Sequence, residues 1–257
     1  MVPETRWHEA RFSQGAATAG GTAHGQTTPR QPRYYPALVG LFAVILVVSN
    51  IIAVKLVLVA GLVLPAAVVL FPLAYILGDV VTEVYGYAAA RRMIWTGFAA
   101  NLLAVGAIWV AARLPAAPFW NVGLGSAAAA DAAFRALFGF TPRLLAASFA
   151  AYLVGEFLNA YVMAKLKVRT EGRWLWLRTI SSTIVGEGVD SATFITLAFY
   201  GIIPAAGLLQ AVVSQWLVKV AYETLATPLT YVVANGLKRA EGMDVFDRQT
   251  DFSPLAF

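Results

Sequence analysis

The chain has 257 residues, of which 59% are hydrophobic and only 13% are charged, and its mean hydropathy is +0.68. A soluble domain carries about 25% charged residues, so this composition indicates a protein that is surrounded by lipid. The absence of cysteine excludes disulfides, thiolate metal sites and cysteine nucleophiles. The net charge of +5 comes from basic residues in short connectors between apolar runs, a placement that favours membrane orientation over nucleic-acid binding.

The two ends of the chain are predicted to be tails. Residues 1–35 are rich in Gly, Ala, Thr, Gln and Pro, and no apolar stretch in them has the length of a signal peptide. We therefore expect a disordered cytoplasmic tail that is retained in the mature protein. Residues 36–233 are predicted to form a single transmembrane domain, and residues 234–257 a cytoplasmic C-terminal tail.

Six apolar stretches are long enough to cross a bilayer as helices, which requires roughly 20 residues each. They cover residues 36–58, 62–84, 93–112, 142–165, 179–203 and 207–233. The gaps at 59–61 and 204–206 leave room only for tight turns. The longer connection, 113–141, contains apolar residues at helical spacing, which predicts a short interfacial helix. The predicted fold class is therefore all-α, a polytopic membrane protein with six transmembrane helices.

The basic residues of the connectors indicate the orientation, because cytoplasmic loops of membrane proteins retain Lys and Arg. Fourteen of them fall in the two tails or in the connectors after the second and fourth spans, and only three fall on the opposite side. Both termini are therefore expected in the cytoplasm. The expected location is the bacterial inner or plasma membrane, which the chain crosses several times.

Polar and ionisable side chains recur within five of the six predicted spans. A charged group at the bilayer centre costs at least about 2.5 kcal/mol, so these side chains are expected to face an interior cavity. Residues four apart share one face of a helix. The resulting faces comprise Asn50 and Lys55; Tyr75, Asp79 and Glu83; Ser148, Tyr152, Glu156 and Asn159; Thr183, Glu187, Asp190, Ser191 and Phe194; and Gln215, Lys219, Glu223 and Thr227.

Several of these residues also allow a structural interpretation. Glu83 could be a solvated helix end beside Arg91 and Arg92. Lys219 and Glu223 could neutralise each other, and Asn50 could make an interhelical hydrogen bond. Glu156, Glu187 and Asp190 could form a hydrogen-bonded network that only determines helix packing.

The embedded acids outnumber the embedded bases by six to two, which suits a cation, a proton or a neutral ligand rich in N–H donors. A carboxylate can accept two parallel hydrogen bonds from the N1–H and exocyclic amine of a guanine-type base. Catalytic signatures such as H-E-x-x-H, G-x-S-x-G and the phosphate-binding loop are absent, and both histidines, His8 and His24, lie in the N-terminal tail. We therefore do not expect an enzyme.

Four segments of the chain resemble the YhhQ-type queuosine precursor transporters, a vitamin-uptake-like family of six-span membrane proteins. They are "SNIIAVKLV" (49–57), "FPLAYILGDVVTEVYGYAAARRMIW" (71–95), "FGFTPRLLAASFAAYLVGEFLNAYVMAKLK" (138–167) and "LRTISSTIVGEGVDSATF" (177–194). The resemblance rests on the combination of D-x-x-T-E-V-Y-G, E-F-x-N and S-T-x-x-G-E-x-x-D. The matching positions are Asn50, Lys55, Asp79, Glu83, Tyr85, Arg91, Arg92, Glu156, Asn159, Glu187 and Asp190.

The resemblance implies import of 7-deazaguanine precursors, such as 7-cyano-7-deazaguanine, for the modified tRNA base queuosine. It also implies a helical fold similar to the substrate-binding subunits of energy-coupling-factor vitamin importers. Such subunits dock onto a shared membrane partner through an A-x-x-x-A pattern, which is absent from the first predicted span. This absence favours a stand-alone carrier over a subunit that works with an ATPase module.

We therefore expect a transport domain that holds a neutral, purine-like molecule near the membrane midplane, without a metal or cofactor. The residues expected to bind this substrate are Asn50, Lys55, Tyr152, Glu156, Asn159, Glu187, Asp190 and Phe194. Those expected to form a cytoplasmic gate or ion pairs are Asp79, Glu83, Arg91, Arg92, Lys219 and Glu223. The alternatives are a substrate-binding subunit of an ATP-driven importer for another vitamin-like molecule, and a membrane-embedded enzyme.

Overall fold

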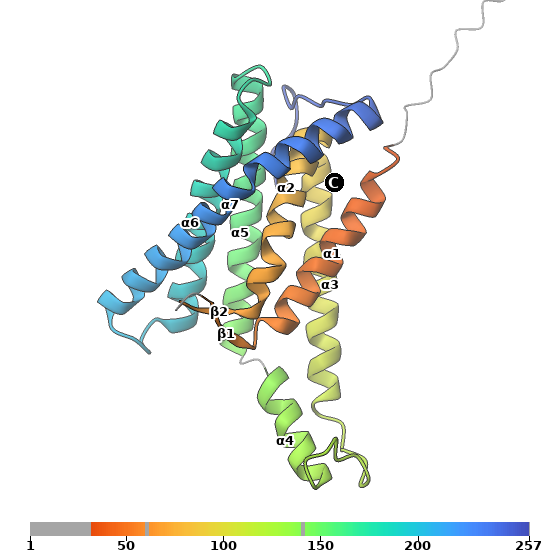
Figure 1. Cartoon of the computed structure of the whole chain (residues 1–257), viewed down its shortest axis with the longest axis vertical. Helices are drawn as coiled ribbons and strands as arrows, with labels where there is room; N and C mark the ends of the chain where they lie inside the picture. Colours follow the sequence, from red (N-terminus) through yellow and green to blue (C-terminus); the bar gives the residue numbers. More distant parts are fainter. Residues whose placement is uncertain (1–31, 60–61, 140–141, 257) are drawn as a thin grey trace, which may run out of the picture. The chain divides into compact units, whose positions relative to one another are not determined.

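The computed structural model describes residues 32–59, 62–139 and 142–256. Seven α-helices contain most of these residues (Figure 1): α1 (Tyr35–Ile52), α2 (Phe71–Tyr85), α3 (Tyr87–Ala111), α4 (Ala127–Phe138), α5 (Pro142–Arg169), α6 (Leu175–Phe199) and α7 (Ala205–Glu241). The predicted helical class is confirmed. Residues 1–31 of the predicted N-terminal tail lie outside the described part of the chain.

A short hairpin replaces parts of the first two predicted spans. Strands β1 (Leu56–Val59) and β2 (Leu62–Pro65) pair antiparallel and are followed by the 3-10 helix η1 (Ala66–Val69). The predicted boundaries 36–58 and 62–84 are therefore wrong, because α1 ends at Ile52 and α2 begins at Phe71. Val and Leu residues suit a strand, and Pro72 suits the first turn of α2, where its missing N–H needs no partner.

Three segments are long and apolar enough to cross a bilayer: α1, α3 and the segment from Ala127 to Arg169 that contains the described helices α4 and α5. α2 has only 15 residues, fewer than the roughly 20 that a perpendicular crossing needs. α6 and α7 have 25 and 37 residues, and polar side chains interrupt their apolar runs. α4 lies within the connection where a short helix was predicted, and Ser126 caps it by accepting a hydrogen bond from the Ala129 N–H at 3.1 Å.

α5 and α6 make the most extensive helix–helix contact of the described chain, and two glycines allow them to approach closely. A Cβ atom added at Gly155 would lie 2.7 Å from the Asp190 Cβ, and one added at Gly186 would lie 2.7 Å from the Asn159 Cβ. Small residues at such crossings let helix backbones come together in membranes. The contact therefore places Glu156 and Asn159 of α5 beside Glu187 and Asp190 of α6.

α2 lies in the interior and packs against α1, α3, α5 and α7. Its residues from Ile76 to Tyr85 are all buried, including Asp79 and Glu83. Such a helix is buried on every side. The two carboxylates that interrupt the apolar sequence of α2 must therefore find partners inside the protein.

Residues 242–256, here called the C-terminal strap, pack back across the junction of α2 and α3 (Figure 1). The Tyr87 N–H donates to Asp247 Oδ2 at 3.0 Å, and Arg91 Nη1 donates to the carbonyls of Asp251 and Ser253, both at 2.9 Å. The expected tail from residue 234 is thus replaced by the end of α7 and an ordered strap. Eight helical residues and the strap's hydrogen bonds were not apparent from composition alone.

Candidate functional site

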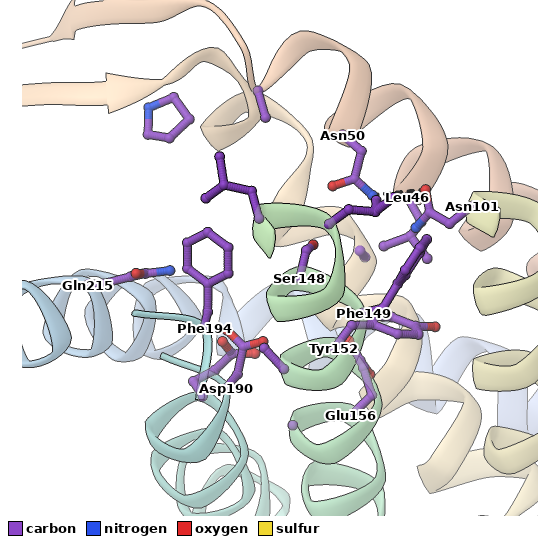
Figure 2. A pocket seen from close by; sticks show the side chains of 18 of the residues that line it. Leu46, Asn50, Asn101, Ser148, Phe149, Tyr152, Glu156, Asp190, Phe194 and Gln215 are labelled. Carbon is purple, nitrogen blue, oxygen red and sulfur yellow. Dashed lines mark hydrogen bonds between the residues drawn. The ribbon is translucent and has the colours of Figure 1, made fainter. Parts of the chain in front are cut away.

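The described helices enclose a cavity of about 430 Å³ (Figure 2). Its volume falls in the range of small-molecule sites, roughly 300–1,000 Å³. Ala53 and Val54, which precede the hairpin, and Pro65, which ends its second strand, belong to the cavity wall. The cavity therefore lies toward the hairpin end of the helices. The polar side chains of the lining come from six helices and are Asn50, Tyr75, Asn101, Ser148, Tyr152, Glu156, Glu187, Asp190, Gln215 and Lys219.

Lys219 of α7 joins the two acids of α6 in the cavity wall. Its ammonium lies 2.6 Å from Glu187 Oε2 and donates a hydrogen bond to Asp190 Oδ2. Tyr75 of α2 hydrogen-bonds to Glu187, and its ring lies beneath the Lys219 ammonium. The possible pairing of Lys219 with Glu223 is therefore wrong, because the ammonium is directed at α6.

Glu156 differs from the other acids of the cavity. Within the described part of the chain it has neither an ion pair nor a hydrogen bond, and its carboxylate belongs to the cavity lining. The carboxylate passes close to Gly78, since a Cβ added there would lie 3.6 Å from Glu156 Oε2. This carboxylate is therefore free to accept hydrogen bonds from a ligand.

Amide and aromatic side chains line the rest of the cavity, with Phe194 beside Asp190 and Tyr152 beside Glu156 (Figure 2). Asn50 Nδ2 of α1 donates to Asn101 Oδ1 of α3 at 2.9 Å, and the Tyr152 hydroxyl donates to the Ile94 carbonyl at 2.9 Å. Phe149 and Phe194 provide flat apolar surface. Asn101 was missed in the sequence, although its amide is the most polar side chain in the apolar run of the third span.

The structure brings together six of the eight residues predicted to bind substrate: Asn50, Tyr152, Glu156, Glu187, Asp190 and Phe194 all line the cavity. Lys55 is exposed in the turn after α1 and is not part of the lining. Asn159 lies one turn beyond Glu156 on α5, where its Nδ2 donates to Asp79 Oδ1 at 2.9 Å. Tyr75, Gln215 and Lys219 line the cavity in addition.

A second charged group surrounds Glu83 and is here called the Glu83 cluster. Its members, from four helices and the C-terminal strap, are Glu83, Lys167, Arg178, Lys238 and Asp244. Arg178 binds both carboxylate oxygens of Glu83, and Lys238 also donates to Oε1. Lys167 donates to the Glu83 carbonyl and, at 2.7 Å, to the Val245 carbonyl.

The Glu83 cluster corrects two predictions. Glu83 is fully buried and is not a solvated helix end. Its partners are not Arg91 and Arg92, because Arg91 binds the carbonyls of the C-terminal strap and Arg92 is exposed. Lys167 and Arg178 were interpreted only as orientation signals, yet both are buried. Their role depends on contacts between helices, which sequence spacing does not reveal.

Asp244 of the strap is held by the same cations. Burial opposes its ionisation, but hydrogen bonds from Lys167 and Lys238 outweigh burial and lower the pKa of this carboxyl. The strap is thereby attached to α5 and α7 through charged hydrogen bonds, which are stronger than neutral ones.

Asp79 and Glu223 lie between the cavity and the Glu83 cluster. On α2, Asp79 is one turn from Tyr75 of the cavity and one turn from Glu83. Glu223 of α7 lies near Asp79, and each side chain is 1% exposed. Of the predicted gating residues, Asp79 and Glu223 form this buried carboxyl pair, Glu83 belongs to the Glu83 cluster and Lys219 lines the cavity. Arg91 and Arg92 belong to none of these groups.

Apolar helices around a polar, small-molecule-sized cavity are the features of a membrane transport protein. The chain matches the family described as "Putative vitamin uptake transporter" over residues 65–233. The chain therefore belongs to the vitamin uptake transporter family, and we regard it as a membrane transporter and not an enzyme. No solved structure matches it.

Two curated relatives carry more detailed names. The chain is 32% identical over 188 residues to the "Probable queuosine precursor transporter" of Bacillus subtilis (strain 168), a match that covers 72% of this chain and 78% of that protein. It is 31% identical over 130 residues to the "Queuosine precursor transporter" of Escherichia coli (strain K12), a match that covers 51% of this chain and 52% of that protein. The first match spans most of both proteins, as expected for members of one family.

Proposed function

We propose that the protein imports a queuosine precursor, a neutral 7-deazapurine such as 7-cyano-7-deazaguanine, across the cell membrane into the cytoplasm. The observation that carries this proposal is the Glu156 carboxylate, which faces the cavity without a protein partner. The N1–H and exocyclic amine of a deazaguanine would donate two parallel hydrogen bonds to it. The names of the two relatives support the same class of substrate.

The rest of the cavity is consistent with a flat, uncharged ligand. Phe149 and Phe194 supply apolar surface for the ring, and the Asn50–Asn101 pair supplies further amide donors and acceptors. Glu156, Glu187 and Asp190 outnumber the single ammonium of Lys219. An anionic ligand such as a nucleotide would therefore be repelled.

The proposed topology has six membrane spans with both termini in the cytoplasm. Lys and Arg residues are concentrated at the helix ends that carry the Glu83 cluster, which would then lie on the cytoplasmic side. The cavity, at the hairpin end, would lie toward the outside. We propose a stand-alone carrier, because the first span lacks the A-x-x-x-A docking pattern.

The test is rescue of queuosine in tRNA. Cells that neither synthesise nor import the precursor would express this protein and receive 7-cyano-7-deazaguanine at nanomolar concentration. We expect the wild type to restore queuosine and Glu156→Gln to abolish rescue at equal abundance in the membrane. Glu171→Gln, the same chemical change at an exposed loop residue, should rescue like the wild type.

Failure of the correctly inserted wild type with every deazaguanine form would overturn the proposal. If the protein restored queuosine in cells but purified protein did not take up substrate in liposomes, the protein would be a subunit that needs a partner ATPase. The two outcomes are separated by measuring uptake of the same radiolabelled compound in both systems.

A further inference from the structure

Two buried carboxyl groups, one from α2 and one from α7, lie inside the helix bundle where these two helices pack together. Asp79 and Glu223 lie near each other, and each side chain is 1% exposed. Apart from the Asn159 amide, which donates to Asp79 Oδ1, no donor of the described residues reaches them. Asp79 Oδ2 and both carboxyl oxygens of Glu223 therefore have no hydrogen-bond donor among the described residues.

A carboxyl group that is buried and receives too few hydrogen bonds is disfavoured in its ionised form, because nothing replaces the water that would solvate the charge. Two adjacent carboxylates cannot both stay ionised in a site that excludes water. The Asp79–Glu223 pair therefore holds at least one proton while its members remain in contact.

The charged groups on every neighbouring element reinforce this conclusion. On α2, Glu83 is already bound by Arg178 and Lys238. On α5, Glu156 and the neutral Asn159 face the pair. On α6, Glu187 and Asp190 are held by Lys219 of α7, whose ammonium points away from Glu223. The nearest unsatisfied charges are therefore acidic, and no described cation pairs with either carboxyl.

The position of the pair links it to both ends of the transport path. Lys219 of the cavity lies one turn before Glu223 on α7, and Lys238 of the Glu83 cluster belongs to the same helix. On α2, Asp79 lies midway between Tyr75 of the cavity and Glu83. Any relative movement of α2 and α7 that opens a path past Glu83 must also separate the two carboxyls.

We propose that the Asp79–Glu223 pair is a proton-binding site that couples uptake to an inward flow of protons, an inference that rests on the proposed function. The pair takes one proton from water on the cavity side. When α2 and α7 separate, the contact that retains the proton is lost, and the proton passes to cytoplasmic water. One neutral substrate and one proton then move inward together, and one positive charge crosses the membrane in each cycle.

The experiment uses the purified full-length protein in sealed liposomes with radiolabelled 7-cyano-7-deazaguanine. Counterflow exchange at equal pH on both sides reports binding and translocation alone. Uptake into liposomes with an acidic exterior reports coupling. With one proton per substrate, each pH unit of gradient supports up to about tenfold accumulation of substrate. One pH unit and a tenfold concentration ratio each correspond to about 1.4 kcal/mol. A protonophore should abolish this accumulation.

Asp79→Asn and Glu223→Gln preserve side-chain shape but remove a titratable group. We expect both variants to retain counterflow and to lose accumulation driven by the proton gradient. The matched controls are Asp131→Asn, which changes a partly exposed residue of α4, and Glu171→Gln in an exposed loop. Both controls should accumulate substrate like the wild type.

Three outcomes are distinguishable from one another. Absence of counterflow in the wild type would overturn the proposed function itself. Counterflow without any response to the gradient, or accumulation that survives both substitutions, would overturn the proton site and leave the proposed function intact. If the variants lose counterflow as well, infrared spectroscopy decides, because the C=O stretch of a protonated carboxyl must be present in the wild type and absent from Glu223→Gln.

Discussion

Glu83 and Arg178 form a two-point ion pair inside the protein, with distances of 2.7 Å from Nε to Oε2 and 2.6 Å from Nη2 to Oε1. Glu83 belongs to α2 and Arg178 to α6, and both side chains are at most 1% exposed. Lys238 of α7 and Lys167 of α5 join the same carboxylate. One acidic group therefore connects four helices, and movement of any of them must disturb charged hydrogen bonds away from water.

Substitution of either partner is expected to destabilise the protein strongly. Glu83→Gln leaves buried cations without their anion, and removing one member of a buried pair costs about 3–5 kcal/mol. Arg178→Lys retains the charge but loses the two-point geometry, so a smaller loss is expected. Denaturant unfolding in detergent micelles, followed by tryptophan fluorescence, would measure both. Arg92→Gln, a surface control, should change stability by no more than about 0.5 kcal/mol. If Glu83→Gln changed stability as little as Arg92→Gln, the structural role of the Glu83–Arg178 pair would be contradicted.

Glu156→Gln is expected to weaken binding of 7-cyano-7-deazaguanine without unfolding the protein. Gln presents one acceptor oxygen where the carboxylate presents two, and a hydrogen bond to a charged group is worth about 1.5–3 kcal/mol. The dissociation constant should therefore rise by roughly 10- to 150-fold, as measured by calorimetry on purified protein. Unchanged affinity together with an unchanged melting temperature would remove Glu156 from the site.

Gly155→Ala and Gly186→Ala are expected to reduce both stability and binding. The added methyl group would lie 2.7 Å from the Asp190 Cβ in the first variant and 2.9 Å from the Gly155 carbonyl in the second. Either change forces α5 and α6 apart and displaces Glu156 relative to Glu187. Gly106→Ala is the matched control: no atom lies within 4 Å of its added Cβ, so it should be neutral or stabilising by up to about 1 kcal/mol. Melting temperatures and substrate affinity of the three variants would test this.

The stability contribution of Asp244 is expected to depend on pH. Hydrogen bonds from Lys167 and Lys238 lower the pKa of this carboxyl in the folded protein despite partial burial, and its unfolded value is about 3.9. Its contribution is therefore present above that value and is lost as the pH falls through the folded-state pKa. The melting-temperature difference between wild type and Asp244→Asn should be constant from neutral pH to about 5 and shrink below about 4. A difference that grows on acidification would reverse the assigned sign.

The sequence alone determined the helical membrane character of the chain and most of the polar side chains that line the cavity. Both depend on local properties, since hydropathy is summed along one segment and residues four apart share one helix face. For this reason Tyr152 and Glu156 on α5, and Glu187 and Asp190 on α6, could be assigned to one interior site before any contact was known. Lys55 was misplaced because α1 ends before it and gives way to a hairpin.

Only the tertiary structure decided which charges meet. Lys219 lies four residues from Glu223 on α7, yet it binds Glu187 and Asp190 of α6. The packing of α7 against α6, where Trp216 Nε1 donates to the Ile184 carbonyl at 3.0 Å, sets which face of α7 meets these acids. Arg178 lies 95 residues from Glu83, and Lys238 lies 155 residues from it. Pairing over such separations depends on how helices pack together, a property that no single helix encodes.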